Sequence, residues 1–199
     1  MLAATGSIAA ASQSASSRSR RIVLTVNVRG FGEIWTMDPD GSRRRRLTWN
    51  RLPDLSPTWS PDGRRLAIAR TLRRSPRRPP RSSIVLVDVV TRIEQVIREG
   101  GSPPALVSDL AWSPDGRWIA FTRITFAQGR CRTSIHAVRP DGSGERQLVR
   151  DGFAPDWSPN GSRLAFATTR PLSEERASTT ARRARRSSSP VPTAPVLGA

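Results

Sequence analysis

The sequence WSPDGRRLAIAR occupies residues 59–70, and two variants follow it: WSPDGRWIAFTR at residues 112–123 and WSPNGSRLAFAT at residues 157–168. In each copy, Ser-Pro-Asp-Gly or Ser-Pro-Asn-Gly lies between two apolar stretches. Proline presets φ at the first turning residue, Asp or Asn suits the second, and glycine takes the left-handed conformation that follows. Each motif is therefore predicted to join two antiparallel strands. The residues that define the hairpins are Trp59, Pro61, Asp62, Gly63, Trp112, Pro114, Asp115, Gly116, Trp157, Pro159, Asn160 and Gly161.

The strand after each turn shows a second regularity when the copies are aligned on their tryptophans. A large apolar residue stands seven and nine positions beyond each Trp, and alanine stands between them, as Ala67, Ala120 and Ala165. Large and small apolar residues thus alternate, and neither face of the strand is polar. Such a strand must be covered on both faces. Sheets stacked on one another satisfy this requirement.

A further strand repeats in the segments 32–42, 82–89 and 133–143, which align with Ile34, Ile84 and Ile135 in register. A weaker strand follows each of them. The repeating unit therefore has four strands: an inner strand that ends in Trp, a second, a third, and an outer fourth. The motif recurs after 53 and then 45 residues, and four-stranded units at this spacing are typical of β-propeller blades.

The stretch MDPDGSRRRRLTWNRLPDLSPTWSPDGRRLAIAR (residues 37–70) resembles the WD40-like β-propeller repeat of the TolB family. The resemblance covers residues 20–170. It implies an all-β fold. The copy count departs from that of the family, because the strands counted along the chain, about 13 between Ile22 and Thr168, make a partial, open β-propeller of about three four-stranded blades. The resemblance also implies a non-catalytic scaffold without a cofactor, which binds a protein or peptide partner. In this family that role is extracytoplasmic or periplasmic and concerns envelope assembly.

The ends of the chain lose the repeat pattern. Residues 1–19 are predicted to be a disordered leader or a degenerate signal segment, without a convincing signal peptide, and residues 171–199 a disordered tail rich in Arg, Ser and Pro. No apolar run approaches the length of roughly 20 residues that a membrane-spanning helix needs.

About three blades cannot close a ring of ordinary curvature, and three hypotheses account for them. The chain is a fragment from an interrupted reading frame, an open arc that self-associates through exposed blade faces, or a degenerate domain that is stable alone. The first is favoured because the pattern stops in mid-blade after Phe166.

The net charge is +17, and every basic residue is arginine. Arginine pairs well with phosphate, but a GC-rich genome also raises the arginine content, and the charge is scattered along the chain. A nucleic-acid partner is therefore disfavoured. The segment RTLRRSPRRPPR (residues 70–81) is predicted to be an exposed loop that contacts an acidic partner. Its contact residues would be Arg73, Arg74, Arg77, Arg78 and Arg81.

No catalytic or metal site emerges from the sequence. A serine hydrolase needs a Gly-x-Ser-x-Gly elbow, and none occurs. The only histidine, His136, falls within a strand and is interpreted as packed between blades, rather than paired with the only cysteine, Cys131. The DPDGS stretch at Asp38 and Asp40 resembles the start of a calcium loop, but tight-turn chemistry explains it. The three motif tryptophans are interpreted as structural.

Two alternative functions remain open at this stage. The chain could be the propeller part of a prolyl-oligopeptidase-like serine peptidase that lacks its hydrolase domain. It could also be a basic nucleic-acid-binding module.

Overall fold

The computed structural model describes residues 21–28, 30–72, 81–99, 105–127 and 129–168. These residues form strands without helices. The strands are β1 (Ile22–Val28), β2 (Phe31–Met37), β3 (Arg45–Arg46), β4 (Asp54–Trp59), β5 (Arg65–Thr71), β6 (Ser82–Asp88), β7 (Glu94–Arg98), β8 (Ala105–Trp112), β9 (Ile119–Ala127), β10 (Arg130–Val138), β11 (Arg146–Arg150), β12 (Gly152–Trp157) and β13 (Leu164–Thr168). The predicted leader (1–19) and tail (171–199) lie outside the described residues.

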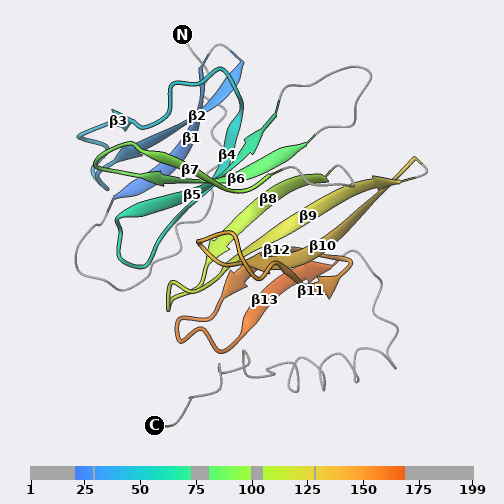
Figure 1. Cartoon of the computed structure of the whole chain (residues 1–199). Coiled ribbons are helices and arrows are strands. Elements are labelled where there is room, and N and C mark those ends of the chain that lie inside the picture. The colour runs from blue at the N-terminus through green and yellow to red at the C-terminus, as the bar shows by residue number, and fades with distance from the viewer. Residues whose placement is uncertain (1–20, 29, 73–80, 100–104, 128, 169–199) are drawn as a thin grey trace.

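Four antiparallel sheets follow one another along the chain (Figure 1). The first sheet has the order β1-β2-β3, the second β4-β5-β6-β7, the third β8-β9-β10-β11, and the fourth β12-β13. The expectation of about 13 strands in four-stranded units is therefore confirmed. The described fold is all-β, with two complete four-stranded blades between two partial ones.

The sheets converge along their first strands. β4 contacts β8, and β8 contacts β12, whereas no comparable contact joins the fourth strands β3, β7 and β11 of the described residues. A stack whose members meet along one edge and spread along the other is a radial arrangement of blades. The first strands thus form the inner edge of a partial β-propeller.

The three tight turns have nearly the same hydrogen bonds. In the first, Ser60 Oγ donates to Asp62 Oδ1 over 2.6 Å and accepts from the Arg65 backbone N–H over 2.9 Å. Gly63 has a φ of 66°, in the region that favours glycine. The turns at Ser113 and Ser158 repeat these contacts. Each turn joins two antiparallel strands, as the motif predicts.

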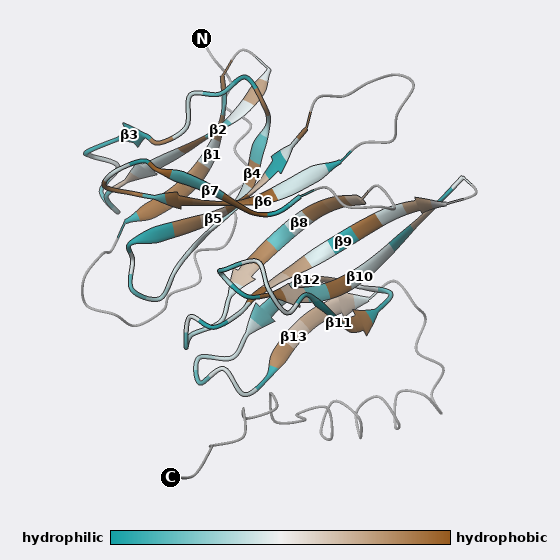
Figure 2. Cartoon of the chain, viewed as in Figure 1, coloured by the Kyte–Doolittle hydropathy of each residue, from teal (hydrophilic) through white to brown (hydrophobic). Residues whose placement is uncertain are grey.

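The alternation of large and small residues sets the order of the stack. On β5, Leu66 and Ile68 pack with Ile34 of the first sheet, whereas Ala67 and Ala69 pack with the third sheet. On β5, large residues therefore face the preceding sheet and small residues face the following one, whereas β6 turns large residues toward both, with Val85 toward the first sheet and Ile84 toward the third. The apolar strands β5, β6 and β9 are brown over much of their length in Figure 2.

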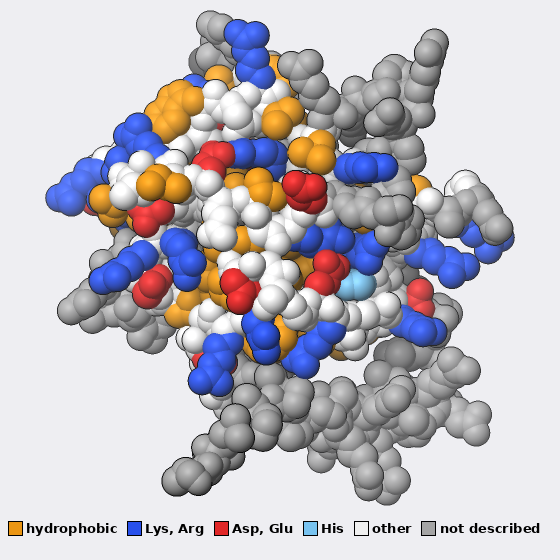
Figure 3. Space-filling model, viewed as in Figure 1, with side chains coloured by type: hydrophobic (Ala, Val, Ile, Leu, Met, Phe, Trp, Pro, Cys, Tyr) orange, Lys and Arg blue, Asp and Glu red, His pale blue; other side chains and the backbone are white. Residues whose placement is uncertain are grey.

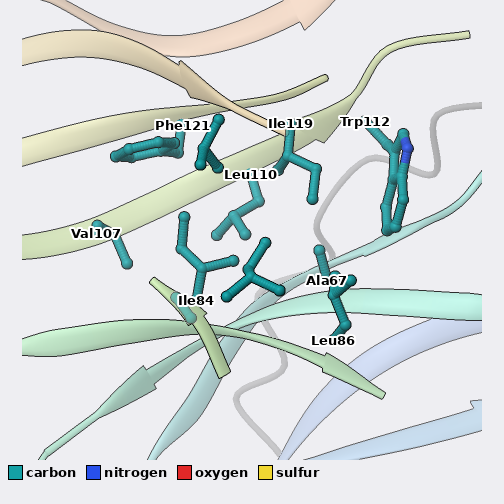
Figure 4. Close-up of a cluster of buried hydrophobic side chains, with 11 residues drawn as sticks. Ala67, Ile84, Leu86, Val107, Leu110, Trp112, Ile119 and Phe121 are labelled. Atoms are coloured by element: carbon teal, nitrogen blue, oxygen red, sulfur yellow. The ribbon is translucent and has the colours of Figure 1, made fainter. Parts of the chain in front are cut away.

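The core between the second and third sheets is shown in Figure 4. It is built from Ala67, Ala69, Ile84, Leu86, Ile97, Val107, Leu110, Trp112, Ile119, Phe121 and Val138. Trp112 is 7% exposed, while Trp59 and Trp157 are half-buried. Burial of a large apolar side chain stabilises a fold by about 1.5–3 kcal/mol, so this interface holds the two complete blades together.

Candidate functional site

Each inner strand is irregular at the same position, three residues before its tryptophan. Ser56, Asp109 and Ala154 have φ values of 51°, 49° and 50°, and the pairing register shifts there in all three strands. The left-handed region is uncommon for residues other than glycine. These irregularities are β-bulges, which re-aim side chains and interrupt pairing. They are therefore a regular feature of the inner edge.

Hydroxyl groups from the preceding sheet hold the bulged strands. The Asp109 N–H donates to Ser56 Oγ over 3.2 Å, and the Ala154 N–H donates to Thr122 Oγ1 over 3.0 Å. The Val107 N–H donates to Ser82 Oγ over 2.6 Å. Because the amides that leave the ladder find acceptors in the preceding blade, the bulges also connect neighbouring blades.

The surface of this edge differs in chemistry from the rest of the chain. The strands β4, β8 and β12 contain no arginine, although the net charge is +17. Leu55 is 43% exposed, and Asp109 and Ala154, which stand at the register of Ser56 in the repeat, are exposed. We call the set Leu55, Ser56, Ser108, Asp109 and Ala154 the inner-edge strip. Its mixture of apolar, hydroxyl and carboxylate groups suits a protein segment better than a polyanion.

A second cluster of polar groups lies between the second and third sheets. Glu145 contacts Arg98 Nε over 3.0 Å, His136 Nδ1 over 3.5 Å and Arg123 Nη1 over 4.0 Å. These residues line a pocket of about 400 Å³. In Figure 3 the histidine lies beside acidic and arginine side chains on the viewed face. The contacts with His136 and Arg98 lower the pKa of Glu145 to about 2, against the opposing effect of partial burial.

The order of groups in this cluster matches that of a serine-hydrolase triad. His136 Nε2 lies 3.2 Å from Ser134 Oγ, while its Nδ1 faces Glu145. However, Glu145 is closer to Arg98 than to His136, so its charge is largely neutralised by the guanidinium. Ser134 also lies inside β10, paired with both neighbouring strands, and not on a strand-to-helix turn that offers amides to an oxyanion. The arrangement therefore suits a polar contact between blades.

The structure also locates the other residues considered from the sequence. His136 is 7% exposed and packs against Phe121, with ring centroids 5.7 Å apart, whereas Cys131 is exposed at the opposite end of β10. Asp38 pairs with arginines, and Asp40 accepts a hydrogen bond from the Ser42 N–H over 2.9 Å. The described residues include no group of three or more His, Cys, Asp or Glu side chains suited to a metal ion.

The structure describes only part of the arginine-rich segment at residues 70–81. Arg81 is exposed, and its carbonyl accepts a hydrogen bond from the Leu72 N–H over 2.8 Å. The residues Arg73, Arg74, Arg77 and Arg78 lie outside the described residues. The role of this loop in partner contact stays a prediction. In the described part of the chain, no helix has the length and apolarity to cross a membrane.

Sequence comparison places the chain beside TolB proteins. It is 31% identical over 152 residues to a TolB homologue of Chlorobium luteolum, covering 75% of this chain and 31% of that protein. It is 33% identical over 142 residues to the Tol-Pal system protein TolB of Anaeromyxobacter dehalogenans, covering 69% and 29%. The chain thus spans about a third of the length of these curated relatives. No protein-family profile matches it.

Comparison with solved structures gives the same fold. TolB from Acinetobacter baumannii superposes with a TM-score of 0.59 at 22% identity, over 78% of this chain and 37% of the other. The tricorn protease and an oligogalacturonate lyase each give a TM-score of 0.56, at 16% and 14% identity. They cover 77% of this chain, and 15% and 44% of theirs. At such identities these likenesses concern the propeller fold alone.

Proposed function

We propose that this chain, whose repeats are TolB-like β-propeller blades, is a non-catalytic scaffold that binds a protein partner along the inner-edge strip. The observation that carries the proposal is the repeated bulge at Ser56, Asp109 and Ala154. It places one exposed or half-buried position on each of three successive inner strands that contain no arginine. At Asp109 and Ala154 this backbone conformation is held by hydrogen bonds to the preceding blade, and backbone held in this way is a rigid platform for a ligand.

The class of protein partner that we propose is based on the TolB relatives of the chain. One of them is a protein of the Tol-Pal system, so we propose a component of that system as the partner and the periplasm as the compartment. The exposed Leu55 offers apolar contact, and Asp109 offers a hydrogen-bond acceptor to an extended segment.

Binding to the soluble domain of the Pal protein from the same genome tests the proposal. We expect Ala154→Arg to weaken the affinity by about tenfold or more, because a long cationic side chain would block the strip. Val90→Arg is the matched control, since Val90 is 74% exposed on the β6–β7 loop. Calorimetric titration measures both variants. The proposal would be wrong if Pal did not bind at tens of micromolar, or if both variants lost affinity equally.

The two alternatives from the sequence have their own tests. Coding sequence for a hydrolase with a Gly-x-Ser-x-Gly elbow, directly downstream, would favour the peptidase propeller. Tight, salt-sensitive binding of DNA in a gel-shift titration, beyond that of other cationic proteins, would favour the nucleic-acid module.

A further inference from the structure

The pocket beside His136 lies between the two complete blades, on the side of their fourth strands. Arg98, at the end of β7, lines it from the second sheet, while Arg123 of β9 and His136 of β10 line it from the third. The turn between β10 and β11 brings the two blades together here, because Gly142 packs closely against the carbonyl of Ile97. The lining of the pocket therefore belongs to the two complete blades alone.

The lining carries an excess of positive charge. Its charged side chains are Arg98, Arg123, Arg146, Glu99 and Glu145. Glu145 remains a carboxylate at neutral pH, because its contacts with His136 and Arg98 lower its pKa to about 2. Three guanidinium groups thus stand against two carboxylates, of which Glu99 is exposed. One further negative charge would balance the pocket.

The same lining is short of hydrogen-bond acceptors. Among the described residues, Arg123 Nε, Arg146 Nε and His136 Nδ1 are buried without a hydrogen-bond partner. The His136 side chain is 9% exposed, and its Nδ1 lies 3.5 Å from Glu145, beyond an ordinary hydrogen bond. Buried polar groups are normally paired, and guanidinium nitrogens can only donate. Orphaned donors that gather around one pocket indicate that a bound acceptor completes the network.

The three arginines differ in what already holds them. Arg98 Nε donates to Glu145 over 3.0 Å, and the guanidinium carbon of Arg146 lies 4.3 Å from the ring centroid of Trp118. Arg123 is held more loosely, because its Nη1 lies 4.0 Å from the Glu145 carboxylate and makes no hydrogen bond to it. Its side chain is 19% exposed. Arg123 is therefore the guanidinium with donors to spare.

We propose that this pocket binds a carboxylate group, which accepts two hydrogen bonds from the guanidinium of Arg123 beside His136. The planar fork of a guanidinium matches the two oxygens of a carboxylate, and one such group supplies the missing negative charge. The volume of about 400 Å³ falls within the roughly 300–1,000 Å³ of small-ligand pockets, so the rest of an organic acid has room. The inner-edge strip lies on the first strands, so this site goes beyond the scaffold role and is independent of Pal binding.

A nuclear magnetic resonance titration tests the proposal. His136 is the only histidine of the chain, so its imidazole Cε1 proton gives one signal that reports directly on the pocket. Sodium glutarate, added at constant pH and ionic strength, should shift this signal saturably with a Kd of roughly 1–10 mM. Neutral glutaramide, of matched size, should leave it unchanged. A capped Gly-Glu-Gly peptide distinguishes the two sources of a carboxylate, because tighter binding than glutarate would identify an acidic side chain and weaker binding a free acid.

Three variants separate binding in the pocket from attraction to a cationic surface. Arg123→Gln should weaken glutarate binding by about tenfold or more, because it removes the fork. Arg117→Gln removes the same charge from the exposed β8–β9 turn and should change the affinity by about twofold or less. Glu145→Gln should have the opposite sign and tighten binding by about threefold or more, because it removes a carboxylate that competes for Arg98 and Arg123.

Circular dichroism checks that each variant keeps its strands. If Arg123→Gln does not, Arg123→Lys takes its place, since it keeps the charge but loses the fork, and we expect about a threefold loss or more. The absence of a shift up to about 50 mM glutarate would overturn the proposal. An equal shift with glutaramide, equal losses in Arg123→Gln and Arg117→Gln, or weaker binding by a folded Glu145→Gln would also overturn it.

Discussion

Gly142 occupies the turn between β10 and β11, where this loop meets the outer strand of the preceding blade. Its φ is +86°, and a Cβ at this position would lie 2.4 Å from the carbonyl oxygen of Ile97 on β7. Gly41 occupies the corresponding turn of the first sheet with a φ of +80°, and among the described residues the one atom within 4 Å of a Cβ there belongs to the flexible end of Arg44, at 3.8 Å. The two glycines share a backbone conformation, but only Gly142 lacks room for a Cβ.

Alanine substitution at each position separates the cost of the left-handed backbone from the cost of the contact between the new methyl group and the Ile97 carbonyl. Each variant forces an L-residue into the left-handed region, which costs about 1–2 kcal/mol. Gly142→Ala also pushes a methyl group into a backbone carbonyl that cannot rotate away, which adds about 1–3 kcal/mol of overpacking. We therefore expect a loss of about 1–2 kcal/mol for Gly41→Ala and about 2–5 kcal/mol for Gly142→Ala.

Urea unfolding followed by tryptophan fluorescence measures the difference at one protein concentration. With a slope of about 1–3 kcal/mol per molar urea, an extra loss of about 2 kcal/mol lowers the midpoint by roughly 1 M relative to Gly41→Ala. Equal midpoints for the two variants would refute the reasoning. They would mean that the loop of the third blade does not pack against β7 as described.

Two further predictions concern the turns and the interface between blades. Ser113 is 2% exposed, and Ser113→Ala removes its hydrogen bonds to Asp115 (2.6 Å) and from the Trp118 N–H (2.9 Å). We expect the free energy of unfolding in urea to fall by about 1–3 kcal/mol, and by less for Ser158→Ala, because Ser158 is less buried. A larger loss of unfolding free energy at Ser158 than at Ser113 would contradict this. The pKa of Glu145 falls from an ordinary 4.5 to about 2 on folding, so its contribution to stability is complete above about pH 4.5 and is lost as the pH falls toward 2. Glu145→Gln should flatten this part of the profile of unfolding free energy against pH, and an unchanged profile would show that another group produces it.

The repeat made most of the architecture predictable. Ser-Pro-Asp-Gly located the turns, and the alternation around Ala67, Ala120 and Ala165 required covered sheets, because both signals are local and periodic. The bulges at the inner edge were not predicted. Ser56, Asp109 and Ala154 share no side-chain type that marks a left-handed residue, and only their distance from the tryptophan is constant. Their alignment in the three copies is the one signal that could have revealed them.

The polar cluster between the blades was missed for a different reason. Arg98 and Glu145 lie 47 residues apart and meet only because one blade stacks on the next. The sequence placed His136 between blades and rejected a pair with Cys131, the one candidate partner near it along the chain, but it named neither Arg98 nor Glu145. A strand separates its residues by about 3.4 Å each, so five residues carry Cys131 far from the imidazole. Contacts between blades depend on the stack, which no single strand pattern encodes.

Several arginines contact tryptophan rings within the fold. The guanidinium carbons of Arg139 and Arg146 lie 5.2 and 4.3 Å from the ring centroid of Trp118, and that of Arg92 lies 4.6 Å from the ring of Trp49. Arginine stacks on aromatic rings and remains charged when partly buried, which lysine does less well. Arginines engaged in this way are less available to phosphate groups. A chain with a net charge of +17 can therefore present an arginine-free inner edge, and it is this edge that we expect to meet a protein partner.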